Sequence, residues 1–214
     1  MKKSIYIAAA LVVALIGSAF MVGNGELESL ELGAKAPMAD VKMAGIDGNA
    51  HTLESLAGEN GLLIVFSCNT CPFVVGREGK SEGWEGRYND VYKSATKAGF
   101  GMVLVNSNEA KRSGDDSMDE MKMHAQSAAY AMPYVVDQDH RLADAMGART
   151  TPHVYLFDKD MTLVYKGAID DNFESAKEVK EPWLKNAMTS CAGGTAIEMN
   201  STRPLGCSIK RVEK

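Results

Sequence analysis

The feature that most constrains this chain is a pair of cysteines between an apolar run and a proline, in the segment FSCNTCPF that contains Cys68, Cys71 and Pro72. The preceding residues 62–66 are apolar and partly β-branched, which is typical of a strand buried on both faces. Proline is favoured at the first position of a helix, so we expect a helix to begin at Pro72 with Cys71 as its N-cap. The two cysteines are therefore predicted to lie where a central strand passes into a helix.

A C-x-x-C motif at such a junction predicts thiol redox chemistry. The first amide groups of a helix have no partner within the helix, and the helix dipole adds partial positive charge at this end. Both effects stabilise a thiolate, which is the reactive form of cysteine. The N-cap position favours Cys71 as the attacking thiol, and the two-residue spacing lets Cys68 reach it and complete a disulfide.

Metal binding is the alternative chemistry for these side chains. Structural zinc usually has four ligands, often in two closely spaced pairs, but Cys191 and Cys207 are far apart in the sequence and do not form a second pair. Soft ligands at helical spacing suggest a copper site; these are Met118, Met121, Met123 and His124. The same spacing is more typical of core packing, so we predict no metal ion.

The composition excludes several classes of function. The chain has 214 residues, of which 45% are hydrophobic and 24% charged, and this indicates one globular domain with a well-packed core. A net charge of −5 and an aromatic content of 7% argue against a surface that binds nucleic acid. The high apolar content also excludes general disorder.

The N-terminus predicts export from the cytoplasm. Two lysines follow Met1, residues 5–16 form an unbroken apolar run, and small residues follow at positions 17–19. This pattern is typical of a secretory signal peptide, residues 1–19, with cleavage after Ala19. Because the apolar character continues to Val22, an uncleaved anchor is the alternative. Either interpretation places the folded domain in the periplasm or outside the cell, where disulfides persist.

The apolar pattern predicts an α/β domain. Strands are expected at residues 41–43, 51–53, 62–66, 101–106, 134–136, 153–158 and 163–167. Helices are expected from residue 72, with a break at the glycines 76, 79 and 83, and then at 84–95, 116–129, 140–147 and 173–189. The Asp47-Gly48 turn joins the first two strands into a hairpin. Alternating strands and helices imply a sheet with helices on both faces.

Between residues 32 and 211 the chain resembles the thioredoxin-fold superfamily, and within it the peroxiredoxin-like redoxins of the alkyl hydroperoxide reductase/thiol-specific antioxidant group. The matching segments, in order, are FSCNTCPFV, VNSNEA, DDSMDEMK, TTPHVYLFD, LVYKGAIDDN and GCSIKR. The resemblance implies a thioredoxin-like fold, with a central mixed sheet flanked by helices and an N-terminal hairpin as an extension. It also implies redox-active Cys71 and Cys68, with Thr151 and a cis Pro152 against them at the substrate-binding position.

The chain departs from the family patterns in ways that bear on its activity. Peroxiredoxins have the motif P-x-x-x-T-x-x-C, but Ile64 and Cys68 occupy the proline and threonine positions before Cys71. The peroxide-binding motif is therefore absent. In thioredoxins the first cysteine of the pair is the helix N-cap, so Cys68 is the alternative attacking thiol.

Two interpretations remain open for the other cysteines. Pairing Cys68 with Cys71 leaves Cys191 and Cys207 to form a structural disulfide that holds the C-terminal segment. The match at GCSIK instead allows Cys207 to be a resolving thiol.

These observations predict an exported thiol–disulfide oxidoreductase with no bound cofactor. Its partner would be a protein that carries a thiol or a disulfide, and neither nucleic acid nor, unless the N-terminal segment is retained, a membrane is expected. One alternative is a thiol peroxidase that reduces hydroperoxides. The other is a non-enzymatic metal-binding chaperone that uses Cys68 and Cys71.

Overall fold

The computed structural model describes residues 27–213. The expected signal peptide at residues 1–19, and the alternative anchor that extends to residue 22, lie outside the described residues. Within residues 27–213, no helix has both the length and the apolar character needed to cross a membrane.

A mixed β-sheet forms the centre of the described molecule, as predicted. Its seven strands are β1 (Met43–Gly45), β2 (Ala50–His51), β3 (Gly61–Phe66), β4 (Phe100–Asn106), β5 (Tyr134–Val136), β7 (His153–Phe157) and β8 (Leu163–Gly167). Their order across the sheet is β2-β1-β5-β4-β3-β7-β8. Strands β3, β4 and β5 pair in parallel, and the other neighbours are antiparallel. This is the mixed sheet of a thioredoxin-like fold, with the β1–β2 hairpin as its N-terminal extension.

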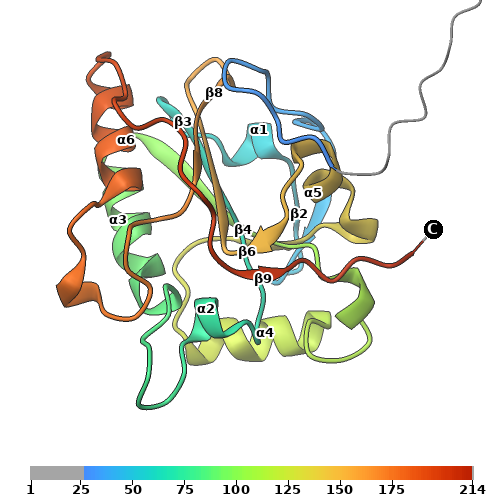
Figure 1. Cartoon of the computed structure of the whole chain (residues 1–214). Helices are drawn as coiled ribbons and strands as arrows, with labels where there is room; N and C mark the ends of the chain where they lie inside the picture. The colour runs from blue at the N-terminus through green and yellow to red at the C-terminus, as the bar shows by residue number, and fades with distance from the viewer. Residues whose placement is uncertain (1–26, 214) are drawn as a thin grey trace, which may run out of the picture.

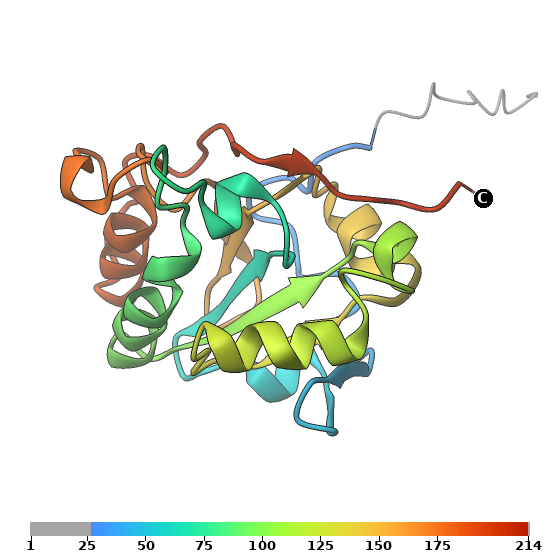
Figure 2. The same cartoon turned by 90° about the horizontal axis from the view of Figure 1, so that it is seen from below.

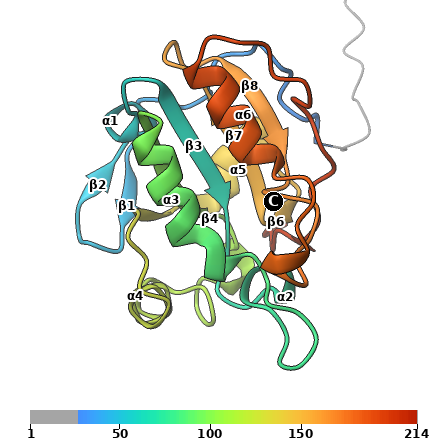
Figure 3. The ribbon, with the colours of Figure 1, turned by 90° about the vertical axis from the view of Figure 1, so that its left-hand side faces the viewer.

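Helices cover both faces of this sheet. They are α1 (Leu53–Leu56), α2 (Pro72–Val75), α3 (Tyr88–Lys97), α4 (Met118–Ser127), α5 (Arg141–Met146) and α6 (Trp183–Ala192). Figure 3 shows α3 and α6 side by side on one face, with α5 behind the sheet. Figure 1 shows α4 along the bottom of the molecule, and Figure 2, seen from below, shows it in front of the strands.

The unbroken apolar run of β3 supplies the core on both faces of the sheet. Successive side chains of a strand point to opposite faces, so Leu63 and Val65 join the core under α3 and α6. Leu62, Ile64 and Phe66 join the second core cluster on the other face. All of them are fully buried, and the end of β3 is therefore a rigid support for the residues that follow it.

Several expected elements are shifted in the structure: the first strand lies at Met43–Gly45 rather than at residues 41–43, and the helix expected at residues 84–95 begins at Tyr88. The strand expected at residues 51–53 ends at His51, because Thr52 and Ser55 make a reciprocal capping box that starts the helix α1. The closing helix begins at Trp183 rather than near residue 173. The preceding loop is held by Asp171, whose carboxylate accepts hydrogen bonds from the backbone amides of Lys180 and Glu181.

The C-terminal segment forms a short second sheet that the sequence did not predict. Strand β9 (Cys207–Ser208) pairs antiparallel with β6 (Thr150–Thr151). We call residues 202–211, which contain β9, the C-terminal strap. Figure 1 shows the strap crossing the molecule between β6 and α2.

Candidate active site

The C-x-x-C pair lies where β3 passes into α2, as predicted. Cys68 lies two residues after the end of β3, and Cys71 is the N-cap of α2 with Pro72 at the first helical position. The helix is a single turn because Gly76, at φ 81°, ends it. The predicted interruption of the helix at the glycines is therefore confirmed, and both thiols lie in a compact turn at the C-terminal end of the central strand β3.

Thr151 joins the two cysteines from the opposite side of the site. The Thr151–Pro152 peptide bond is cis, as the resemblance implied. The Cys71 Sγ lies 3.0 Å from the Thr151 carbonyl oxygen, to which it donates a hydrogen bond when it is protonated. The Cys68 Sγ lies 3.1 Å from the Thr151 hydroxyl oxygen, a second hydrogen bond. A residue 80 positions downstream of Cys71 thus contacts both thiols.

Cys207 also lies at this site, because the pairing of β9 with β6 places it opposite Thr151. Its backbone N–H donates to the Cys71 Sγ at 3.3 Å. Under the strap, Cys68 and Cys71 are only 2% and 3% exposed. The site therefore contains three thiols, and the strap covers the two of the C-x-x-C motif.

The pKa of Cys71 is lowered to about 5, chiefly by a hydrogen bond from the Cys68 thiol. Burial raises this pKa, but the thiol and backbone N–H of Cys207 and the amide of Phe73 lower it further. The sequence predicted stabilisation by a helix dipole, yet α2 has only four residues. Individual donors near the sulfur, and not a long helix, therefore favour the thiolate.

The other two thiols of the site are held in their protonated form. The pKa of Cys68 is raised well above its ordinary value, first by its hydrogen bond to Cys71 and then by burial. Burial and the neighbouring Cys71 raise the pKa of Cys207 to about 11. At neutral pH the site therefore holds one thiolate, on Cys71, with two thiols beside it.

A buried carboxylate that no local motif indicates holds the loop between the two cysteines. Asp116 is fully buried and accepts a hydrogen bond from the Asn69 backbone N–H at 3.0 Å. It also accepts from the side-chain amides of Asn106, at 2.7 Å, and Asn108, at 2.9 Å. The Tyr134 hydroxyl donates to the Asn69 side chain at 3.0 Å. The loop is thus fixed by side chains from β4, β5 and the segment before α4.

Cys191 is separated from this site. It lies on α6 and lines a cavity of about 500 Å³ with Leu32 and Asp158, beyond the C-terminal end of β7. Cys207 lies near Thr151, before the start of that strand. All four cysteines, each within the described residues, carry free thiols. The structure does not bring Cys191 and Cys207 together, because the two residues lie at opposite ends of β7, and of the two interpretations it therefore favours Cys207 as a thiol of the site.

The methionine and histidine set on α4 is also not brought together. Met121 is buried in the core, whereas Met123 is 55% exposed. His124 instead forms a hydrogen-bonded ion pair with Glu85. Among residues 27–213, no group of three or more His, Cys, Asp and Glu side chains is arranged to hold a metal ion.

The comparisons with known structures find two uncharacterised bacterial proteins with this architecture. A conserved protein from Geobacillus kaustophilus is 28% identical, with a TM-score of 0.75 over 86% of this chain and 94% of that one. A hypothetical protein from Sinorhizobium meliloti is also 28% identical, with a TM-score of 0.76 over 87% of this chain and 98% of that one. The chain therefore spans nearly the whole length of both proteins.

A more distant structure shows the same fold. The thioredoxin domain of a thiol-disulfide oxidoreductase from Bacteroides vulgatus is 19% identical, with a TM-score of 0.51 over 64% of this chain and 89% of that one. No curated protein matches the sequence. The AhpC/TSA family pattern matches residues 32–166, which include β3, both cysteines of the C-x-x-C motif and the Thr151–Pro152 pair. The chain therefore belongs to the AhpC/TSA family.

Proposed function

We propose that this protein is an exported thiol–disulfide oxidoreductase in which Cys71 attacks and Cys68 resolves. The observation that carries the proposal is the contrast between the two thiols. The pKa of Cys71 is lowered to about 5 by hydrogen bonds, whereas the pKa of Cys68 is raised well above its ordinary value. Thiol–disulfide exchange requires a reactive thiolate that attacks and a neighbouring protonated thiol that resolves the mixed disulfide.

The reaction follows from this arrangement. The Cys71 thiolate attacks one sulfur of a substrate disulfide, and the substrate S–S bond breaks as the Cys71 mixed disulfide forms. Once Cys71 is bonded, it no longer accepts a hydrogen bond as a thiolate from Cys68. Cys68 then passes its proton to the first substrate thiolate and attacks the Cys71 Sγ, which releases the second substrate sulfur as a thiolate that takes up a proton from water. The substrate disulfide becomes two thiols as the protein gains a Cys68–Cys71 disulfide.

The test is a single turnover with oxidised glutathione as the probe disulfide. Reduced wild-type protein and the control Cys191→Ser should release glutathione at the same rate, well above that of an ordinary thiol at the same pH. Cys71→Ser should lose this rapid release. Retention of the wild-type rate by Cys71→Ser would overturn the assignment of the attacking thiol.

A thiol peroxidase is the second candidate, favoured by the position of Cys207 beside Cys71. The Cys71 thiolate would attack a peroxide oxygen and break the O–O bond, which leaves a sulfenic acid and an alcohol or water. A neighbouring thiol would then condense with the sulfenic acid to form a disulfide and water. Stopped-flow mixing with hydrogen peroxide discriminates the two candidates. Slow oxidation of Cys71 beside rapid glutathione release supports the oxidoreductase, and the reverse supports the peroxidase.

Export rests on the N-terminal sequence alone. We expect the mature protein in the periplasmic or secreted fraction, with an N-terminus at Phe20 after cleavage behind Ala19. Fractionation and N-terminal mass mapping test this expectation. Recovery of the intact chain in the cytoplasmic fraction would contradict it, and intact chain in the membrane fraction would indicate the uncleaved anchor.

A further inference from the structure

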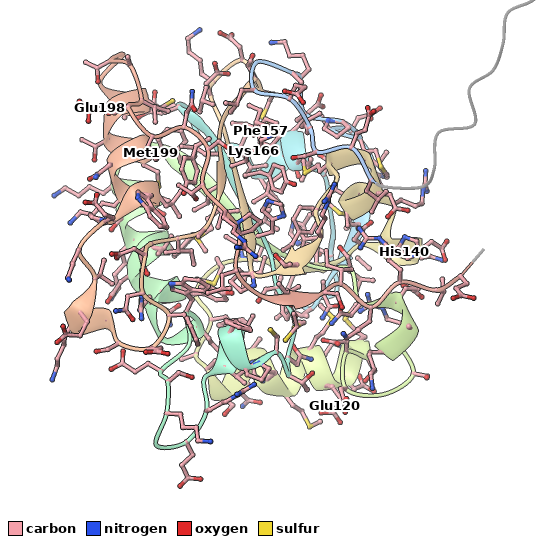
Figure 4. The ribbon with its side chains drawn as sticks, viewed as in Figure 1. Glu120, His140, Phe157, Lys166, Glu198 and Met199 are labelled. Carbon is pink, nitrogen blue, oxygen red and sulfur yellow. The ribbon has the colours of Figure 1, made fainter. Side chains whose placement is uncertain are left out.

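The C-terminal strap is fastened on both sides of Cys207. Before it, the Thr202 hydroxyl oxygen accepts a hydrogen bond from the Ala168 backbone N–H at 2.9 Å. After it, Ile209 is 4% exposed in the core, and the Arg211 guanidinium donates to the Asp144 carboxylate at 2.8 Å. Close to the chain end, His140 lies beside the strap's continuation (Figure 4), and its ring faces the Val212 carbonyl oxygen at 3.3 Å. Contacts on both sides of Cys207 thus hold the strap in place over the thiols.

Between these fastenings the strap lies very close to the site. A side chain at Gly206 would place its Cβ 2.2 Å from the Thr151 carbonyl oxygen, far inside contact distance. The same carbonyl oxygen accepts the hydrogen bond from the Cys71 thiol. The closeness of the strap at Gly206 therefore brings the next residue, Cys207, to the Cys71 sulfur.

Cys71 has two thiol neighbours that belong to different segments of the chain. Cys207 donates its backbone N–H to the Cys71 sulfur at 3.3 Å, and Cys68 shares with Cys71 the contact with Thr151. Cys68 is in the same turn as Cys71, and a disulfide between these two cysteines would leave the strap without a covalent bond to the site. A disulfide from Cys207 would instead fix the strap covalently over the site.

We propose that Cys207 is a redox-active latch, which closes the strap by forming a disulfide with Cys71 and releases it when Cys68 takes Cys207's place. The inference rests on the proposed function and specifies how the access of protein disulfides to that site is regulated. It makes Cys207 a third exchanging thiol, with the strap as the element that it moves.

The exchange balances without an added oxidant or reductant. The latched form arises when the Cys207 thiolate attacks Cys71 in the Cys68–Cys71 disulfide that the proposed reaction leaves, which forms the Cys71–Cys207 disulfide and frees Cys68 as a thiol. The reverse step releases the latch. Cys68 loses its proton and attacks the Cys71 Sγ, the Cys71–Cys207 bond breaks, and the Cys207 sulfur takes up a proton. The products are a Cys68–Cys71 disulfide and a free Cys207 thiol, so the oxidation level of the protein is unchanged. The strap is then held by hydrogen bonds and Ile209 alone.

The test is disulfide mapping after oxidation with one equivalent of diamide, followed by acid quench and alkylation. Trypsin leaves Cys191 and Cys207 in one peptide, because Pro204 follows Arg203 and protects that bond. The experiment is therefore done in the Cys191→Ser background, which also serves as the matched control. One tryptic peptide contains both cysteines of the C-x-x-C motif. A disulfide between this peptide and the C-terminal peptide must then involve Cys207.

Two further variants make the outcomes decisive. In that background, Cys68→Ser should give monomer in which Cys71 is bonded to Cys207, and Cys207→Ser should give the Cys68–Cys71 disulfide. Free thiols on both Cys71 and Cys207 in the oxidised Cys68→Ser variant would overturn the latch. If the Cys68–Cys71 disulfide still forms in Cys207→Ser, the proposed function survives that failure. If the Cys71–Cys207 disulfide forms in Cys68→Ser but the Cys68–Cys71 disulfide does not form in Cys207→Ser, the role of Cys68 as the resolving thiol is contradicted.

Hydrogen exchange tests the movement of the strap separately. The amides of Cys207 and Ile209 are bonded to the Cys71 sulfur and the Arg149 carbonyl oxygen. These amides should exchange more slowly in the form with the Cys71–Cys207 disulfide than in the form with the Cys68–Cys71 disulfide. Equal exchange in both forms would show that the disulfide does not control the strap.

Discussion

At the scale of single residues, the reactivity of the site depends on which groups face the Cys71 sulfur. The donors come from the C-x-x-C turn, from the first turn of α2 and from the C-terminal strap. The hydrogen bond from the Cys68 thiol is the largest of these effects and exceeds the opposing effect of burial, and the remaining donors favour the thiolate further. Cys71 is thus made acidic by residues that the fold collects.

Removing the first of these donors should raise the pKa of Cys71. Cys68→Ala deletes the hydrogen bond that contributes most to lowering this pKa to about 5. A hydrogen bond to a charged group contributes about 1.5–3 kcal/mol, so we expect a rise of roughly one pKa unit or more. Ultraviolet absorbance of the thiolate against pH measures the change, and Cys191→Ala is the control that should leave the titration unaltered. An unchanged midpoint in Cys68→Ala would contradict this account of the thiolate.

At the scale of elements, the helices and strands that carry a clear apolar pattern or a capping motif could be predicted from the sequence. Short elements without such a local signal could not. The apolar run of β3 and the start of α2 at Cys71 and Pro72 are local signals, and the structure confirms both. Strand β9 has only two residues, and its pairing with β6 depends on contacts across more than fifty positions. No local pattern reports such a contact.

The same distinction applies to the candidate site. Cys68, Cys71 and the Thr151–Pro152 pair could be found from motifs and from the resemblance to a family. Asp116 could not, because its partner Asn69 is 47 positions away and an aspartate before a helix is ordinarily interpreted as a cap. In the structure the cap is Ser117, which leaves Asp116 free to hold the C-x-x-C loop.

The strap as an element is open to a direct test. Gly206→Ala would place a Cβ 2.2 Å from the Thr151 carbonyl oxygen, and overpacking of this kind costs about 1–3 kcal/mol. The open state should then be roughly 5- to 150-fold more populated, with a matching increase in the alkylation rate of Cys71. Gly86→Ala, where nothing lies within 4 Å of the new Cβ, is the control. An alkylation rate equal to that of wild type would show that the strap does not limit access.

At the scale of the whole molecule, the two faces of the sheet have separate cores, and a buried histidine links stability to pH. His153 begins β7 and is 4% exposed. Burial, together with the nearby charges of Lys166 and Arg149, lowers its pKa to about 3. The folded protein therefore keeps this imidazole neutral under conditions in which the unfolded chain would protonate it.

This linkage predicts loss of stability in acid. The ordinary pKa of histidine is 6.5 and that of folded His153 is about 3, so the unfolded chain binds more protons between these values. The contribution of neutral His153 to the free energy of unfolding is fully present above pH 6.5. It is lost as the pH falls towards 3, at up to about 1.4 kcal/mol per pH unit. The test measures the free energy of unfolding by denaturant at several pH values in the Cys71→Ser background, which removes the Cys71 ionisation. The slope of this free energy against pH should be shallower for His153→Asn than for the background protein. His51→Asn, on the β1–β2 hairpin, is the control, and equal slopes for all three proteins would contradict the linkage.

The central claim is that Cys71 is the reactive thiol, and competitive alkylation of the reduced wild-type protein tests it most directly. At pH 6 the lowered pKa of Cys71, about 5, leaves it largely ionised, whereas the raised pKa values of Cys68 and Cys207 keep both protonated. A limiting amount of iodoacetamide, followed by quench and fragment-ion mapping, identifies the modified sulfur. The account predicts that the label lies on Cys71. A label predominantly on Cys68 would contradict it.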